Sequence, residues 1–570
     1  MPVNSRAQKP LDVAIIGAGH NGLVAAAYLA RAGLSVALFE RRGIVGGAAV
    51  TEEFAPGFRN STASYTVSLL HPKIIRELRL AEHGLVILPR PMQNFLPLPD
   101  EDALYVPREP DAWRREVARH SRGDAERLEA WNRFITEAAD LLRELALQTP
   151  PTDLSRWPDL WRLLSAGRRW RALPLARARS LYELFTRSAG EILDDWFESD
   201  ALKALYGFDA IVGNYASPYT PGSAYVLLHH AFGEVNGHRG LWGHALGGMG
   251  SISNAMALEA QAQGARIETG DAVARVDVRN GHACGVQLES GRRIEARVVA
   301  ANVNPKLLYL QLVEPQHLPA EFIDAMRRYR CGSATFRINV ALAELPRFTA
   351  AMRTPAPPGV DGQHHLGSGI ILAPSLTYMD HAFAEARLQG YSGAPVIEML
   401  IPSTLDASLA PPGAHVASLF CQHFAPELPD HRPWASAREQ MTALIFDTVA
   451  RYAPNFKSAL LGHSALTPAD LQERFGLIGG DIFHGALSLD QLWAARPVLG
   501  YADYRSPIPG LYLCGAGAHP GGGVSGMPGH NAAQRILQDW PRLRRRRLHR
   551  ERGASRAASA PRDDDSLSNG

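Results

Sequence analysis

Residues 12–22, which read DVAIIGAGHNG, decide the fold of this chain. The apolar run 12–16 predicts a short, buried strand of the parallel type. Residues 21–32 predict an alanine-rich helix that ends at Gly33, a natural C-terminal stop, and residues 35–40 predict a second buried strand. Together these segments form a strand–helix–strand unit.

Three glycines lie where the first predicted strand turns into the helix. Gly17 makes the tight turn, Gly19 lets the backbone approach a pyrophosphate, and Gly22 lets helix and strand pack closely. The helix N-terminus offers unpaired N–H groups and a positive dipole end to phosphates. Glu40 ends the second strand, where its carboxylate can accept hydrogen bonds from a ribose diol. The stretch therefore predicts a dinucleotide-binding fingerprint.

A glycine pair follows this acid in the stretch ERRGIVGGAA, residues 40–49. A simple nicotinamide dehydrogenase has no need of close backbone approach at Gly46 and Gly47. A longer cofactor that continues toward a flavin ring would need it, because only glycine lets a backbone come that near.

A glycine-rich loop near the C-terminal end follows a predicted strand at 511–514 and reads GAGAHPGGGVSGMPG over residues 515–529. Its backbone can lie flat against a planar ring. The next helix, which starts near Pro528, would point its positive end at that ring. Because reduced flavin carries negative charge around N1, such a helix favours the reduced form. The loop therefore predicts a flavin site.

These stretches together resemble the phytoene desaturase-like FAD oxidoreductases of the bacterial carotenoid desaturase type. The shared pattern also includes Gly247-Gly248-Met249 and AHPGGG at 518–523, and it extends over about residues 11–540. Segment 12–70 is most similar to a branch known from animals and bacteria. The resemblance implies an α/β fold with an interrupted Rossmann-like FAD-binding domain and a mixed α+β substrate domain, in a glutathione reductase/amine oxidase-like architecture.

The resemblance also implies non-covalent FAD, with Glu40 at the adenosine ribose and Val273 at the adenine. The residues that would line the cofactor are Gly17, Gly19, Gly22, Glu40, Arg41, Gly46, Gly47, Ala48, Val273, Gly515, Gly523, Val524 and Met527.

The chain is expected to divide its domains into alternating segments. The FAD-binding domain is predicted at 11–90, 244–310 and 490–540. The substrate domain is predicted at 91–243, which is helical and arginine-rich, and at 311–489. Residues 541–570 are of low complexity and predict a disordered basic tail.

Composition limits the partners and the compartment. The net charge of +2 argues against nucleic acid as a partner. The four cysteines form no C-x-x-C pair, so neither a redox dithiol nor a metal site is predicted. With no signal region and no run of ~20 apolar residues, we expect a cytoplasmic, intracellular protein, mitochondrial in a eukaryote. The basic, tryptophan-containing segment 157–170 leaves peripheral membrane contact open, and the oligomeric state is also open.

The expected chemistry is hydride transfer between flavin N5 and a C–H substrate, and the resemblance favours a small, apolar, polyene- or lipid-like one. His519, in the flavin loop, is the candidate catalytic group, with packing against that loop as the alternative. His229, His230 and His244 are further candidates to face the substrate. Two other functions stay open: a flavin amine oxidase, for which Lys306 is the one lysine beside a predicted flavin-domain strand, and a flavoprotein with a mainly regulatory role.

Overall fold

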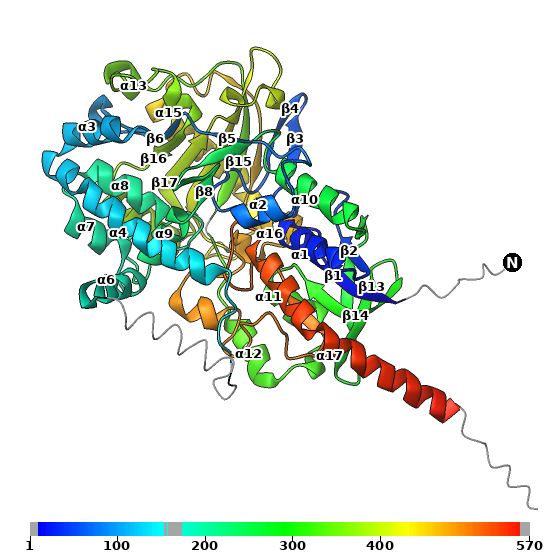
Figure 1. Ribbon diagram of the computed structural model, residues 1–570. Helices are drawn as coiled ribbons and strands as arrows, with labels where there is room; N and C mark the ends of the chain where they lie inside the picture. Colours follow the sequence, from blue (N-terminus) through cyan, green and yellow to red (C-terminus); the bar gives the residue numbers. More distant parts are fainter. Residues whose placement is uncertain (1–9, 153–156, 158–173, 334, 559–570) are drawn as a thin grey trace, which may run out of the picture.

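The computed structural model describes residues 10–152, 157, 174–333 and 335–558 (Figure 1). Within these residues, two seven-stranded sheets organise the chain. The flavin-domain sheet includes both the N-terminal strand and the last strand of the chain. The substrate-domain sheet is made of segments that lie between them in sequence.

The flavin-domain sheet has the strand order β11-β2-β1-β14-β13-β12, and β20 pairs with β14. The central pairs β1–β2, β1–β14 and β14–β20 are all parallel. Helix α1 packs against α10 and α17 beside this sheet, and nearly every residue of β1 is buried. The strands are β1 (Leu11–Ile16), β2 (Val36–Glu40), β11 (Arg266–Thr269), β12 (Val273–Arg279), β13 (His282–Leu288), β14 (Arg293–Ala301) and β20 (Leu511–Leu513).

The substrate-domain sheet has the order β19-β15-β18-β17-β16-β6-β7. Along β15, Phe336, Ile338 and Val340 pack into one apolar core. Arg337 and Asn339 alternate with them and therefore face the other side of the sheet. The strands are β6 (Met92–Pro97), β7 (Ala103–Pro107), β15 (Phe336–Leu342), β16 (Gly369–Leu372), β17 (Tyr391–Leu400), β18 (His415–Phe424) and β19 (Leu460–Leu466).

Helices and short hairpins complete the two domains. The hairpins are β3 (Thr51–Ala55) with β4 (Phe58–Ser61), and β8 (Glu234–Val235) with β9 (His238–Arg239). A further antiparallel pair joins the distant strands β5 (Ile87–Pro89) and β10 (Gly243–Ala245). The helices are α1 (His20–Arg31), α2 (Pro72–Glu77), α3 (Pro110–His120), α4 (Arg122–Ala146), α6 (Leu175–Thr186), α7 (Ala189–Trp196), α8 (Asp200–Asp209), α9 (Ala224–Ala231), α10 (Gly250–Ala262), α11 (Pro305–Leu307), α12 (Ala320–Arg328), α13 (Thr349–Arg353), α14 (Leu376–Gln389), α15 (Arg438–Tyr452), α16 (Pro468–Phe475) and α17 (Met527–Ala558).

The expected α/β architecture is confirmed, and the predicted strand–helix–strand unit is formed by β1, α1 and β2. The strands of the flavin-domain sheet lie within 11–90, 244–310 and 490–540. Packing extends this domain further, because Phe322, Met326 and Tyr329 share one apolar core with β1 and β14. The domain boundaries themselves stay predictions.

The C-terminal region differs from the predicted tail. Helix α17 continues through the predicted disordered segment 541–570 as far as Ala558. Trp540 and Leu543 pack against the core of the flavin domain, and the arginines and alanines that follow favour a helix. Residues 559–570, and all of the segment 157–170 except Trp157, lie outside the described residues. In the part of the chain that the structure describes, no helix is long and apolar enough to span a membrane.

Candidate functional site

Parallel strands bring distant segments together at one edge of the flavin-domain sheet. The N–H of Gly17 donates to Phe39 O, the N–H of Asn302 to Ile16 O, and the N–H of Cys514 to Ala301 O. The carboxyl ends of β1, β2, β14 and β20 therefore meet at this edge. In open α/β sheets, ligands bind in the crevice outside such strand ends.

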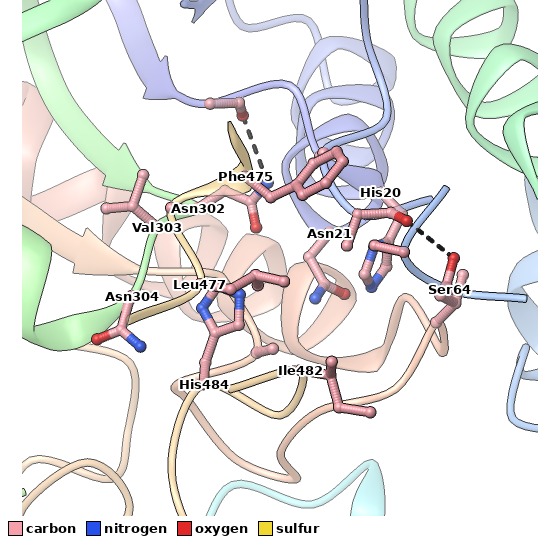
Figure 2. Close-up of a pocket in the computed structure, with 18 of the residues that line it drawn as sticks. His20, Asn21, Ser64, Asn302, Val303, Asn304, Phe475, Leu477, Ile482 and His484 are labelled. Atoms are coloured by element: carbon pink, nitrogen blue, oxygen red, sulfur yellow. Dashed lines mark hydrogen bonds between the residues drawn. The ribbon is translucent and has the colours of Figure 1, made fainter. Parts of the chain in front are cut away.

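A cavity of about 460 Å³ lies at this edge and extends to the substrate domain (Figure 2). Nine of the thirteen predicted cofactor residues line it. They are Gly17, Gly19, Glu40, Arg41, Gly47, Ala48, Val273, Gly523 and Val524. The sequence thus identified much of this wall, although the cofactor contacts themselves stay predictions.

The other four predicted residues lie behind the cavity wall. A Cβ at Gly22 would lie 2.4 Å from Gly17 O, and a Cβ at Gly46 would lie 2.5 Å from Ala49 O. Gly515 packs against Asn302, and Met527 is a buried core residue at the start of α17. These positions shape the wall through close packing.

Asn302 is a site residue that sequence patterns did not single out. It directly follows β14, and its Nδ2 lies 3.5 Å from Gly17 O. Added Cβ atoms at Gly19 and Gly22 would meet the same nitrogen at 2.8 and 2.9 Å. The asparagine therefore fills the space that the glycines leave. Its position at the end of a parallel strand beside β1 was the only available signal.

The N-terminus of α1 is open toward a ligand. Its N-cap residue is Gly19, and no side chain caps the first turn. Glu40, at the end of β2, accepts hydrogen bonds from the N–H of Ala18 (2.8 Å) and the N–H of Arg42 (3.0 Å). A carboxylate has about four acceptor positions, so Glu40 retains capacity for a ribose diol. The free N–H groups and the acid fit a dinucleotide.

Four buried polar atoms on lining residues have no hydrogen-bond partner among the described residues: Arg42 Nη1 beside Glu40, and His20 Nε2, Asn21 Oδ1 and His484 Nδ1, whose side chains are labelled in Figure 2. Figure 2 shows the last three side chains around one space. Burial lowers the pKa of His20 to about 4 and that of His484 to about 3, so both imidazoles are neutral at pH 7. Buried polar groups are normally paired, and a polar, ring-shaped ligand such as flavin would satisfy such atoms. The lining therefore fits the expected cofactor.

Two arginines close the cavity near Glu40. Arg42 and Arg474 both bond Glu52 Oε1, at 2.7 and 2.9 Å, and both lie over the ring of Phe475, at 4.9 and 5.6 Å from its centroid. Burial alone would raise the pKa of Glu52, but the two guanidinium groups hold it below its usual value. The cluster joins the segment after β2 to α16 and so connects the predicted substrate domain to the cofactor side.

A buried guanidinium lies behind the glycine-rich loop. Arg496 is fully buried and donates to Phe483 O (2.6 Å) and Ala516 O (2.9 Å), two residues of the cavity wall. It also donates to Gln491 O at 3.2 Å. Arg496 therefore holds the loop against the segment that carries His484, and it places a positive charge one layer behind the wall.

His519 does not line the cavity. Its Nε2 lies 3.1 Å from Leu145 O at the end of α4, and its ring meets Trp493 edge-on at 4.9 Å. Burial lowers its pKa to about 4. The structure thus gives His519 a contact that ties α4 to the loop, which differs from the predicted packing against the loop itself. Its catalytic role stays a prediction that no cavity contact supports.

The other candidate side chains are distributed unevenly. His230 lines the cavity, whereas His229 packs against Phe483 at 5.5 Å between ring centroids. His244 bonds Asp406 at 3.1 Å and lies away from the lining. Lys306 is likewise absent from the lining.

Comparison with known proteins also indicates a flavin-binding protein. The family model of flavin-containing amine oxidoreductases matches residues 22–338. Pyridine nucleotide-disulfide oxidoreductase domain-containing protein 2 of Rattus norvegicus is 42% identical over 551 residues, which cover 93% of each chain. The lycopene-forming phytoene desaturase of Pseudescherichia vulneris is 25% identical over 90% of this chain and 96% of its own. The solved structure of cyclohexylamine oxidase from Brevibacterium oxydans has a TM-score of 0.54 at 16% identity, covers 93% of this chain and 100% of its own, and so shares the fold. These matches confirm the resemblance that the sequence motifs predicted.

Proposed function

This chain belongs to the family of flavin-containing amine oxidoreductases, and on that premise we propose that it is an FAD-dependent dehydrogenase acting on a CH–CH group of a small, largely apolar substrate. The flavin and the oxidoreductase class come with the family. The type of bond, the substrate class and the non-covalent attachment of FAD are the proposal.

The apolar character of the cavity away from the dinucleotide turn carries this proposal. The residues that give it this character are Leu69, Val212, Trp242, Ile482 and Phe483. Apolar walls bind hydrocarbon by removing its surface from water. A relative that covers nearly the whole chain is named as a phytoene desaturase, whose substrate is a hydrocarbon, and this supports the same class of chemistry.

Two observations favour this proposal over an amine oxidase. Lys306, the lysine beside a flavin-domain strand, is not part of the lining. Among the lining residues that the structure describes, the carboxylates are Glu40, which bonds the N–H of Arg42, and Glu289, whose N–H donates to Ala272 O beside Val273 on the predicted adenine side. A buried ammonium group would need a nearby negative charge.

The protein's part in the reaction is to bind, orient and exclude water. FAD supplies the hydride acceptor when bound. The α1 N-terminus and Glu40 would hold its phosphates and ribose, and the apolar residues keep water from the reacting carbon. His20 and His484 are neutral at pH 7 because burial lowers the pKa of each. Arg496 fixes the carbonyls of Phe483 and Ala516, which keeps the wall rigid.

Anaerobic reduction of the purified holoprotein tests the proposal. We expect heat denaturation to release FAD into solution, as non-covalent attachment requires. We expect a monoterpene hydrocarbon to bleach the visible flavin absorbance, and cyclohexylamine to leave it unchanged. Bleaching by the amine and not by the hydrocarbon would transfer the assignment to amine oxidation.

A pair of variants locates the reaction in the cavity. Leu69→Asn places an amide in the apolar wall and should slow bleaching by the hydrocarbon while FAD content is retained. Leu246→Asn makes the same change at a residue outside the lining that is 43% exposed, and it should react like the wild type. Equal rates in both variants would argue against a substrate in this cavity.

A further inference from the structure

The hydrogen bonds of His230 fix its tautomer. His230 is in α9, and its Nδ1 lies 2.9 Å from Asp209 O and 3.0 Å from Val226 O. Both partners are carbonyl oxygens, which only accept, so Nδ1 must carry the proton. In a neutral imidazole the other nitrogen is then a bare acceptor. Burial lowers the pKa of His230 to about 4, which keeps the ring neutral at pH 7.

The acceptor nitrogen has no use within the described protein. His230 lines the cavity, and its Nε2 makes no hydrogen bond to a described residue. The ring stacks on Trp242, with 5.9 Å between centroids and 20° between planes, and lies 6.3 Å from the ring of Phe483. Two carbonyl bonds and two aromatic neighbours therefore hold one lone pair in an otherwise apolar part of the wall.

Two hydroxyl groups of the wall direct their protons into the protein as well. The hydroxyl of Tyr65 donates to Glu398 at 2.5 Å, and the hydroxyl of Thr66 donates to Gly243 O at 3.1 Å. Neither hydroxyl has a second proton to offer to a ligand. Toward a ligand in this cavity, these two hydroxyls and His230 Nε2 can therefore only accept hydrogen bonds.

The buried charges behind this wall favour a neutral donor over a cation. Glu398 is already paired with Arg90, whose Nη2 lies 3.5 Å from its Oε1. A second guanidinium, that of Arg337, lies 4.6 Å from the centroid of the Tyr65 ring. These arginines at least balance the carboxylate, so an ammonium group would gain little attraction here and would lose its hydration.

We propose that His230 Nε2 accepts a hydrogen bond from a hydroxyl group of the substrate, so that the enzyme selects hydroxylated apolar molecules over pure hydrocarbons of the same shape. This inference rests on the proposed function for its substrate cavity, and it names a specificity-determining residue within it. A hydroxyl that is left without an acceptor in an apolar cavity costs binding free energy, and this cost is the source of the selection.

Binding of two probes to the oxidised holoprotein tests this inference. Benzyl alcohol and benzyl methyl ether share a ring and an oxygen, but only the alcohol can donate. We expect calorimetry to give a dissociation constant about 3- to 10-fold lower for the alcohol, which is the range of one net hydrogen bond. Equal affinities in the wild type would overturn the proposal without any variant. Tighter binding of benzylamine, which is protonated at neutral pH, would overturn it also.

Matched variants assign the preference to one nitrogen. His230→Phe keeps an aromatic ring beside Trp242 and removes the acceptor, and it should bind the two probes equally. His229→Phe changes the adjacent histidine, which is buried but outside the lining, and it should retain the preference. A preference that survives His230→Phe would refute the role of Nε2. Binding needs no turnover, so a holoprotein that prefers the alcohol yet is bleached neither by a monoterpene hydrocarbon nor by a monoterpene alcohol would contradict the proposed function alone.

Discussion

Gly22 offers a sharp test of how α1 is placed, because a single added methyl group meets backbone. In Gly22→Ala the Cβ would lie 2.4 Å from Gly17 O and 2.9 Å from Asn302 Nδ2. Ordinary contact begins near 3.4 Å, so helix and turn must separate by about 1 Å. Gly17 cannot yield easily, since its N–H bonds Phe39 O at 2.8 Å. The N-terminus of α1 therefore has to move.

The free-energy cost of moving the N-terminus of α1 follows from what overpacking costs in other proteins. Overpacking of this kind costs about 1–3 kcal/mol. The displaced N-terminus is the expected phosphate site, so we expect the affinity for FAD to fall by a factor of about 5 to 150. Gly529→Ala should act in the same direction, because its Cβ would lie 2.1 Å from Asn21 O and press on the same helix.

Titration of apoprotein with FAD, followed by quenching of flavin fluorescence, measures this effect. Gly43→Ala is the matched control, because a Cβ there meets nothing within 4 Å and the residue does not have a positive φ. It should bind FAD like the wild type. If Gly22→Ala were to bind FAD within twofold of Gly43→Ala while remaining folded, the close packing of this turn would not be what positions the cofactor.

Three further predictions concern buried groups. Burial, with the charge of Glu398, raises the pKa of Asp209 to about 7. Between about pH 4 and 7 the unfolded chain has released this proton and the folded chain still holds it, so the free energy of unfolding should fall as the pH rises. Asp209→Asn should remove this fall in urea unfolding compared at about pH 5 and about pH 8, and an unchanged pH dependence would contradict the assignment. Arg496→Met should lower the reduction potential of the bound flavin, by about 30 mV for each tenfold loss of preference for the reduced form. The control Arg327→Met, at an exposed arginine, should leave the potential unchanged. Equal potentials in the two variants would exclude this effect of Arg496. Burial raises the pKa of every thiol, so at about pH 8 iodoacetamide should label the folded protein far more slowly than the unfolded one, and rapid labelling of the folded chain would count against this. The thiols are those of Cys284, Cys331, Cys421 and Cys514.

The dinucleotide turn could be predicted because its physical demands are local in sequence. Gly17 has φ of +86° and Gly47 has φ of +58°, a backbone region that favours glycine, so the requirement is visible in the residue type itself. Asn302 contacts Gly17 of this turn from 285 residues away along the chain. Nothing about an asparagine after an apolar strand distinguishes it, and its role depends on the pairing of β14 with β1.

The substrate side could not be predicted for the same physical reason. Tyr65, His230 and Phe483 lie on three distant segments that only the tertiary fold brings to one cavity. The extent of α17 was missed because composition alone describes an arginine-rich segment as solvated. The contacts of Trp540 and Leu543 with the flavin-domain core are what extend the helix into that segment.

The two histidines His519 and His230 show why position in a motif is a weak guide to chemistry. His519 belongs to the glycine-rich loop, yet its Nε2 bonds Leu145 O, so its proton serves the end of α4. His230 belongs to no motif, but both of its carbonyl partners are on Nδ1, and Nε2 remains available on a residue of the cavity wall. What an imidazole can do depends on which nitrogen the fold has already used. Substitution of His230 should therefore change the affinity for a hydroxylated substrate. Substitution of His519 should first weaken the contact between α4 and the glycine-rich loop.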